Sequence, residues 1–305
     1  MSRIRAFAPA SVGNAGVGFD LLGFALDFCG DLVEVAASDP GVRILSISGA
    51  KNLPLGAAEN TATAGLIKLI GDKRLPFGFD VRISKGIPIG SGLGGSAASA
   101  VAGIVAASAL LDEPLSQSEL IEYALVGEAV ASGAAHEDNV IPSLLGGLQI
   151  CDGKDSQAIP VPEELFVVVV HPSLSVKTME SRLRLPDSIP LTQLVQQSRY
   201  LAQFIAAGFG NDAQKFGRAC IDLIAEPHRV DFIPGFEIAR RRAISAGAWS
   251  VSISGSGPTL FAFVPKNLQS QVEKLMVGVF TSQGIDTKSW CTTISQKGAR
   301  IEDIG

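Results

Sequence analysis

The spacing of hydrophobic and polar positions changes along the chain and separates predicted strands from predicted helices. Short runs rich in β-branched and aromatic residues predict strands over residues 4–8, 32–37, 43–48, 79–84, 250–254, 259–264 and 288–294. The apolar run LFVVVVHP at residues 165–172 predicts a fully buried strand that ends at a proline. Stretches with helical periodicity predict helices over residues 61–70, 96–111, 116–132, 191–207, 212–224, 236–246 and 268–283. This mixture favours an α+β fold.

A polar segment, residues 152–164, interrupts the pattern near the middle of the chain. It contains Gly153, Pro160 and Pro162, which disfavour continuation of a helix or a central strand. A length of 305 residues is sufficient for two domains of ordinary size. We therefore predict one domain of residues 1–160 and a second of residues 161–305.

Composition and charge exclude several classes of protein. The chain is 47% hydrophobic and 18% charged, which excludes a disordered chain. Its 25 Lys and Arg against 30 Asp and Glu give a net charge of −5, which disfavours a nucleic-acid partner. Residues 94–111 carry no charge, but they are mainly Ala, Gly and Ser. They therefore predict a buried helix rather than a membrane span, and we expect no membrane partner.

The cysteines and histidines show no disulfide or metal pattern. The four cysteines (Cys29, Cys151, Cys220 and Cys291) lie far apart, and the amino terminus has no apolar signal segment. We therefore expect reduced thiols in a cytoplasmic protein. The three histidines show no HxxxH spacing, which argues against a zinc site.

The strongest chemical signal is a glycine-rich segment, PIGSGLGGSAASA at residues 88–100, directly before a predicted helix. Glycines let backbone N–H groups approach an anion, and the start of a helix adds unpaired donors and positive potential. The segment lacks the lysine of a Walker A loop, and no acidic residue follows at dinucleotide-binding spacing. By itself it fits either a triphosphate site or a tight turn before a closely packed helix.

Two further segments narrow this choice. APASVGNAGVGFDLLGFAL, residues 8–26, places Asn14 and Asp20 in a loop of small and apolar residues. SISGSGPTLFAF, residues 252–263, is a second glycine loop between predicted strands. Together with residues 88–100, and in this order along the chain, they resemble the three motifs of the GHMP kinases. The resemblance implies a two-domain fold, with an N-terminal ribosomal-protein-S5-domain-2-like domain and a C-terminal ferredoxin-like α/β sandwich.

Other segments resemble the homoserine kinases within this superfamily. They are residues 128–148, 176–186, 224–236 and the GARIE sequence at 298–302. The resemblance implies that the protein uses ATP and Mg²⁺ to phosphorylate the hydroxyl group of L-homoserine. The product would be O-phospho-L-homoserine, an intermediate of threonine biosynthesis, and the enzyme would be a homodimer.

Four polar side chains in these segments suit a substrate that carries both a carboxylate and an ammonium group. Arg182 and Arg229 each offer a planar fork that can grip a carboxylate with two hydrogen bonds. Asn14 and Asp20 offer acceptors for an ammonium group in an otherwise apolar loop. From the resemblance we also expect His136, Thr178 and Gly257 to contact the substrate.

The remaining candidates surround the nucleotide, the metal and the reacting hydroxyl. Glu128 and the Ser96 hydroxyl are oxygen ligands of the kind that Mg²⁺ prefers. Asp138 and Asn139 follow the helix of Glu128, and we expect them to act in catalysis together with Arg229. The resemblance assigns to ATP binding Pro88, Ile89, Gly90, Ser91, Gly92, Leu93, Gly94, Gly95, Ser96, Ala97, Ala98 and Asn60, with Thr61 beside the adenine.

These assignments have plainer alternatives. Arg182 and Glu128 are typical of solvated helix charges, and His136 is typical of a structural hydrogen-bonding residue. The alternative functions are a GHMP kinase for another small alcohol and a non-catalytic small-molecule binder on the same fold. Gly95 stands where many relatives carry a serine, and no lysine is expected near Asn14 or Asp20. The sequence therefore leaves the proton acceptor open.

Overall fold

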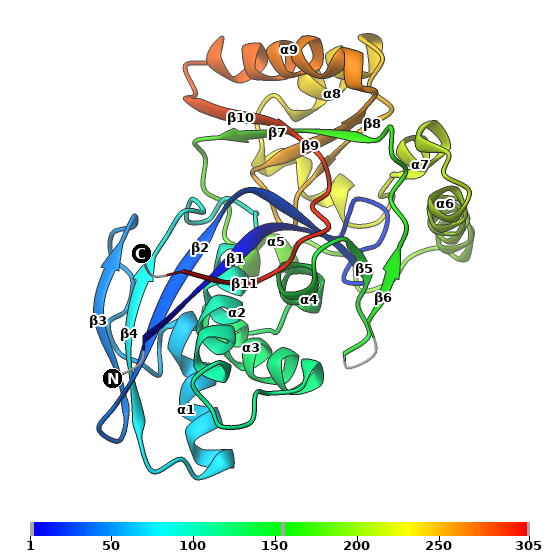
Figure 1. Ribbon diagram of the computed structural model, residues 1–305. Helices are drawn as coiled ribbons and strands as arrows, with labels where there is room; N and C mark the ends of the chain where they lie inside the picture. Colours follow the sequence, from blue (N-terminus) through cyan, green and yellow to red (C-terminus); the bar gives the residue numbers. More distant parts are fainter. Residues whose placement is uncertain (1–2, 154–155, 304–305) are drawn as a thin grey trace.

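The computed structural model describes residues 3–153 and 156–303, and its larger sheet is built on two long antiparallel strands (Figure 1). These strands are β1 (Arg3–Gly13) and β2 (Leu22–Ser38). Both run beyond the predicted residues 4–8 and 32–37, because the small residues that extend them have little strand propensity without a partner. Within the described residues the strand order is β11-β1-β2-β4-β3, and β5 joins β2 to β6. The other strands are β3 (Val42–Ser48), β4 (Gly78–Ser84), β5 (Leu148–Ile150), β6 (Gln157–Ile159) and β11 (Arg300–Glu302).

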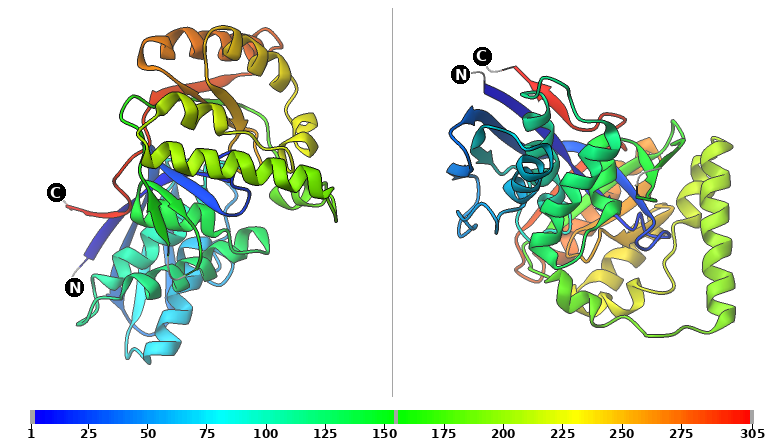
Figure 2. Two further views of the ribbon diagram at one scale, coloured as in Figure 1. Left: turned by 90° about the vertical axis from the view of Figure 1, so that its right-hand side faces the viewer. Right: turned by 90° about the horizontal axis from the view of Figure 1, so that it is seen from below.

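Four helices cover this sheet (Figures 1 and 2). They are α1 (Thr61–Lys73), α2 (Gly95–Ser108), α3 (Gln117–Ser132) and α4 (Glu137–Leu145). Of these, α1, α2 and α4 contact the strands of the sheet, whereas α3 packs on the other helices. The uncharged stretch 94–111 contains α2, which is buried along most of its length, as predicted. The predicted capping box of Ser116 and Glu119 at the start of α3 is confirmed. The hydrophobic pattern does not predict α4, because polar residues and Pro142 interrupt it.

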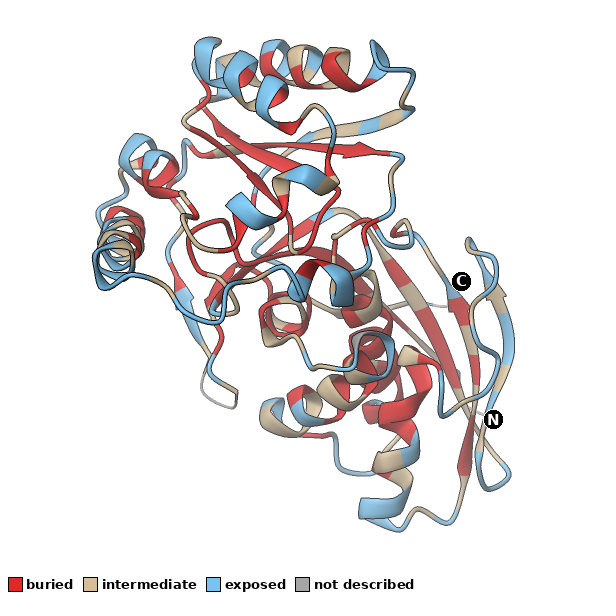
Figure 3. Cartoon of the chain, turned by 180° about the vertical axis from the view of Figure 1, so that it is seen from behind, coloured by how far each residue is buried: buried red, intermediate tan, exposed pale blue. Residues whose placement is uncertain are grey.

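The smaller sheet is antiparallel, with the order β10-β7-β9-β8 in the described residues. Its central strand β7 explains the unbroken valine run, since both of its faces are covered (Figure 3). Val167 and Val169 join the core of the larger sheet, whereas Val168 and Val170 join a second core under the helices α8 and α9. The elements are β7 (Phe166–Pro172), β8 (Ser250–Ile253), β9 (Leu260–Val264), β10 (Thr287–Thr292), α8 (Phe236–Ser245) and α9 (Gln269–Thr281).

Between the sheets the chain forms α5 (Thr178–Arg182), α6 (Leu191–Phe209) and α7 (Ala213–Ala219). The predicted helix over residues 212–224 is therefore too long. It ends at Ala219 because the side chain of Asp222 accepts the backbone N–H groups of Ile224, Ala225 and Glu226, which folds the chain into a turn. Short 3₁₀ turns at Glu226–His228 and Val230–Phe232 follow, and Lys266–Leu268 precedes α9.

The two sheets share an aromatic contact. The ring centre of Phe24 on β2 lies 5.4 Å from that of Phe261 and 5.8 Å from that of Phe263, both of which are on β9. Near the carboxyl end, β11 returns to pair with β1. The division at residues 160 and 161 stays a prediction. Among the described residues, no helix combines the length and the apolar character that a bilayer crossing requires.

Candidate active site

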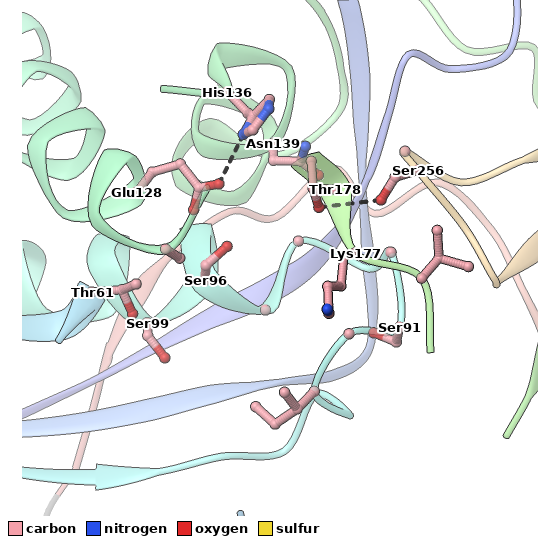
Figure 4. A pocket seen from close by; sticks show the side chains of 18 of the residues that line it. Thr61, Ser91, Ser96, Ser99, Glu128, His136, Asn139, Lys177, Thr178 and Ser256 are labelled. Carbon is pink, nitrogen blue, oxygen red and sulfur yellow. Dashed lines mark hydrogen bonds and ion pairs between the residues drawn. The ribbon is translucent and has the colours of Figure 1, made fainter. Parts of the chain in front are cut away.

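A cavity of about 790 Å³ lies where the three glycine-containing motifs meet (Figure 4). The loop between β1 and β2 contributes Asn14 and Asp20, the loop before α2 contributes residues 88–92, and the loop between β8 and β9 contributes Gly255 and Ser256. Segments far apart in the sequence therefore line the same cavity. The cavity is large enough for a nucleotide and a small acceptor together.

The loop before α2 has the backbone shape of an anion site. Gly90, Gly92 and Gly94 have φ values of 66°, 78° and 64°, which strongly favour glycine. A Cβ atom on Gly92 would lie 2.5 Å from the carbonyl oxygen of Ser254. No side chain caps α2, so the N–H groups of its first turn remain available to an anion in the cavity. The tight turn and the anion site, which the sequence offered as alternatives, are thus compatible.

The glycine loop between β8 and β9 binds the loop of residues 88–95 before α2, which we call the anion loop, from the other domain. The hydroxyl of Ser254 donates to the carbonyl of Gly92 at 2.7 Å. The backbone N–H of Thr259 donates to the carbonyl of Ser91 at 3.2 Å. The position of the anion loop therefore depends on both domains.

A buried lysine that no sequence pattern singles out holds the carboxyl end of the anion loop, and its partner Asp31 holds the amino end. Lys85, whose side chain is 4% exposed, forms an ion pair with Asp31 and donates to the carbonyl of Gly95 at 2.6 Å and to the hydroxyl of Ser99 at 2.8 Å. Asp31 also accepts the backbone N–H of Gly86 at 3.0 Å. Lys85 lines the cavity as well, with its charge balanced by Asp31.

Oxygen donors for a divalent cation lie beside the anion loop. Figure 4 shows the carboxylate of Glu128 and the hydroxyl of Ser96 facing the same part of the cavity. Glu128 is 3% exposed and contacts Nδ1 of His136 at 3.1 Å, a bond that raises the pKa of His136. In the described parts of the chain, no three His, Cys, Asp or Glu residues gather to hold a metal. Glu128 and Ser96 therefore fit Mg²⁺ only if phosphate oxygens and water complete its shell.

The acceptor side of the cavity is organised around Asn14, which has a φ of 67°. Its backbone N–H donates to the carboxylate of Asp138 at 2.8 Å. Its side chain donates to the carbonyl of Gly255 at 3.1 Å and accepts the backbone N–H of Asp20 at 3.1 Å. Asn14 thus joins three predicted site segments, and these bonds use one of its two amide N–H groups and one of the two lone pairs on its side-chain oxygen.

The two predicted carboxylate ligands differ in their surroundings. Arg182 is half-exposed and forms an ion pair with Asp20. Arg229 is 4% exposed and donates to the carbonyl of Gly255 at 2.8 Å, and its Nε atom has no partner among the described residues. Burial lowers the pKa of Arg229 from its usual range. Such a desolvated cation is prepared to bind an anion.

Asp138 and Asn139 lie in the first turn of α4, next to Asn14 and the anion loop. Asp138 is buried, and burial raises the pKa of its carboxyl to about 6. The hydroxyl of Ser11 donates to the side-chain oxygen of Asn139 at 3.0 Å. A buried carboxylate with a raised pKa in a cavity is typical of functional sites.

Glu226 is another buried acid, and sequence analysis assigns it no role. Its carboxylate accepts the hydroxyl of Ser252 at 2.5 Å and pairs with Arg240 at 2.9 Å, and burial raises its pKa to about 7. It therefore anchors the turn that carries Arg229 onto β8.

The structure gathers most of the predicted residues at the cavity and leaves four of them outside its lining. The predicted residues that line it are Asn14, Asp20, Asn60, Thr61, Pro88, Ile89, Gly90, Ser91, Gly92, Gly94, Gly95, Ser96, Glu128, His136, Asp138, Asn139, Thr178, Arg182 and Arg229. Those that do not line it are Leu93, Ala97, Ala98 and Gly257. Leu93, Ala97 and Ala98 pack into the core instead. Gly255 and Ser256 line the cavity in the loop that contains Gly257, and Ser256 contacts the hydroxyl of Thr178 at 3.3 Å (Figure 4).

Comparisons with known proteins agree with this geometry. The chain matches the GHMP kinases N terminal domain family over residues 45–147 and the GHMP kinases C terminal family over residues 201–276. It is 44% identical over 300 residues to a homoserine kinase of Xylella fastidiosa, covering 97% of this chain and 93% of that protein. It is 39% identical over 319 residues to a homoserine kinase of Chlorobium phaeobacteroides, covering 99% of this chain and all of that one.

A solved structure extends the agreement to three dimensions. The crystal structure of homoserine kinase from Cytophaga hutchinsonii matches with a TM-score of 0.94 and 38% sequence identity, covering 99% of this chain and 98% of that one. A mevalonate kinase structure, at 14% identity and a TM-score of 0.67, shares the fold. The predicted two-domain fold is confirmed, and the chain belongs to the homoserine kinase family of the GHMP kinases.

Proposed function

We propose that the protein transfers the γ-phosphoryl group of ATP to the hydroxyl group of L-homoserine. The observation that carries this assignment is the placement of a buried, incompletely paired Arg229 and an Asp20–Arg182 ion pair in the cavity that also contains the anion loop. A triphosphate and a zwitterionic acceptor both find matching charge there. A sugar or another uncharged alcohol would bring no anion to Arg229, whose buried Nε has no hydrogen-bond partner among the described residues.

Homoserine would exchange partners with the Asp20–Arg182 ion pair. Its ammonium group would take Asp20, and its carboxylate would take Arg182 and Arg229. Each protein charge then keeps an opposite charge, so binding strands none of them. Sequence analysis assigns Asp20 and Arg182 to opposite ends of the substrate, and their ion pair, which holds the two charges side by side, supports that assignment.

ATP would bind with its phosphates on the N–H groups of residues 90–96, above Lys85. Asn60, whose side chain caps α1, stands at the predicted adenine end. Glu128 and Ser96 would hold Mg²⁺, which neutralises phosphate charge when bound. Asn60, Glu128 and Ser96 are assigned here by donor type and by their place in the cavity lining.

In the transfer, the homoserine oxygen forms a bond to the γ-phosphorus while the bond to the β–γ bridging oxygen breaks and ADP leaves. Asp138 and Asn139 would orient the hydroxyl, and Asp138 would take its proton, because its carboxyl is ionised yet basic at neutral pH. Positioning and charge neutralisation would supply most of the rate. A homodimer stays a prediction from the resemblance, and a cytoplasmic location stays a prediction from the cysteines and the amino-terminal sequence.

An assay of ADP release tests the proposal against its alternatives. The purified protein is supplied with ATP and Mg²⁺ and, separately, with L-homoserine, mevalonate or galactose. We expect turnover with L-homoserine above all. Preference for another alcohol would favour the alternative kinase, and absence of turnover with every acceptor would favour a binding protein.

A further inference from the structure

Phe19, which directly precedes Asp20, has two cations over its ring. The guanidinium carbon of Arg229 lies 5.2 Å from the ring centre, and that of Arg182 lies 5.7 Å from it. In the rest of the described chain, every other aromatic ring in such a contact receives a single cation. Phe19 is therefore the common neighbour of the two arginines that the proposed function assigns to the carboxylate.

Two arginines that bind one carboxylate must lie near each other before the carboxylate arrives. Their like charges repel, and Arg182 adds to the lowering of the Arg229 pKa that burial begins. The face of an aromatic ring carries negative potential and attracts both cations. The ring accepts no conventional N–H bond in the guanidinium plane, so it takes up none of the donors that pair with Asp20, with Gly255 or with a ligand.

A carboxylate in the place of Phe19 would act differently. It would pair with the arginines and compete with the substrate, as Asp20 already does for Arg182. The half-buried ring instead stabilises the arrangement of the two cations without adding a negative charge that would compete with the substrate. The acceptor's carboxylate can then supply that charge.

We propose that Phe19 is a positioning residue that sets Arg182 and Arg229 for the acceptor's carboxylate, and so helps the enzyme select an amino acid over an amino alcohol. This inference rests on the proposed function, because it requires that the two arginines bind the carboxylate.

The test compares Phe19→Leu with the unmodified protein, using L-homoserine and its carboxylate-free analogue 3-aminopropan-1-ol. We expect the KM for L-homoserine to rise about tenfold, with kcat, the KM for ATP and the KM for the amino alcohol unchanged. Phe19→Tyr keeps the ring and should keep the KM for L-homoserine. Phe7→Leu is the matched control, since it removes the half-buried ring under Arg300 at 4.2 Å, away from the cavity lining.

A replacement that keeps the shape of the ring separates its charge distribution from its packing. Pentafluorophenylalanine at position 19 has nearly the same outline but lacks the negative face, so it should raise the KM for L-homoserine as Phe19→Leu does. An equal loss with both acceptors, a fall in kcat, or an unchanged KM with the fluorinated ring would overturn the inference. The unmodified protein is assayed first, and no turnover of L-homoserine in that assay would reject the proposed function itself.

Discussion

Replacement of Arg229 by leucine tests the assignment of the acceptor's charges. Leucine fills much of the same space but removes the cation that faces the cavity. The carbonyl of Gly255, which loses its bond to Arg229, keeps the side chain of Asn14 at 3.1 Å as a donor. We therefore expect Arg229→Leu to fold, and its thermal unfolding should confirm this before any kinetic comparison.

The magnitude follows from the burial of the arginine. Because Arg229 is 4% exposed, a carboxylate bound to it has little water to replace a lost partner. Removal of one partner from a desolvated charge pair costs about 2–5 kcal/mol. This corresponds to a loss of about 30- to 4,000-fold in kcat/KM for L-homoserine. Binding of ATP should hardly change, since Arg229 makes its described contact with the loop between β8 and β9.

The assay is a two-by-two comparison of unmodified and Arg229→Leu protein, each with L-homoserine and with 3-aminopropan-1-ol. The amino alcohol has no carboxylate to strand, so its kcat/KM should be insensitive to the change. Arg184→Leu is the control, because Arg184 is exposed and lies outside the cavity lining. Equal damage with both acceptors would mean that Arg229 acts on the phosphate or on the fold, and the carboxylate assignment would be wrong.

Three further changes test the rest of the site. Gly90→Ala should weaken ATP binding in calorimetry by about tenfold, because it adds a methyl group at a φ of 66° in the anion loop. The control Gly71→Ala, which has open space around it, should leave ATP binding unchanged, and equal ATP affinities of the two variants would reject the loop's role. Glu128→Gln should raise the Mg²⁺ concentration needed for half-maximal turnover, whereas the control Glu122→Gln, on the exposed face of α3, should not. An unchanged Mg²⁺ concentration for half-maximal turnover in Glu128→Gln would make Glu128 a structural acid. Asp138→Asn should lower kcat yet stabilise the fold at pH 7 by up to about 3 kcal/mol, because burial raises the pKa to about 6 and makes the ionised form costly. The raised pKa means that this cost is absent below about pH 4, so the stability gain should vanish there in chemical denaturation; a gain independent of pH would contradict the reasoning.

The parts of the site that could be predicted from the sequence are those with local causes. The anion loop needs Gly90, Gly92 and Gly94 because each has a positive φ, and such a requirement is visible in the sequence of the loop itself. The valine run of β7 and the capping box of α3 are similarly local patterns.

The parts that could not be predicted depend on partners distant in the chain. Lys85 follows a strand, where a charged residue is usually exposed, and only the fold brings it to Asp31 and the carbonyl of Gly95. Glu226 becomes a buried anchor only because β8 places Ser252 beside it. The long extension of β2 likewise depends on its pairing with β1 rather than on its own propensity.

The most direct test of the central claim is identification of the phosphorylated product by phosphorus NMR and mass spectrometry. Unmodified protein is incubated with ATP, Mg²⁺ and L-homoserine, and the experiment follows where the γ-phosphoryl group of ATP goes. The account predicts a phosphate monoester on the side-chain oxygen of L-homoserine, formed in equal amount to ADP. Release of inorganic phosphate in place of that ester, or L-homoserine left unmodified while ATP persists, would contradict it.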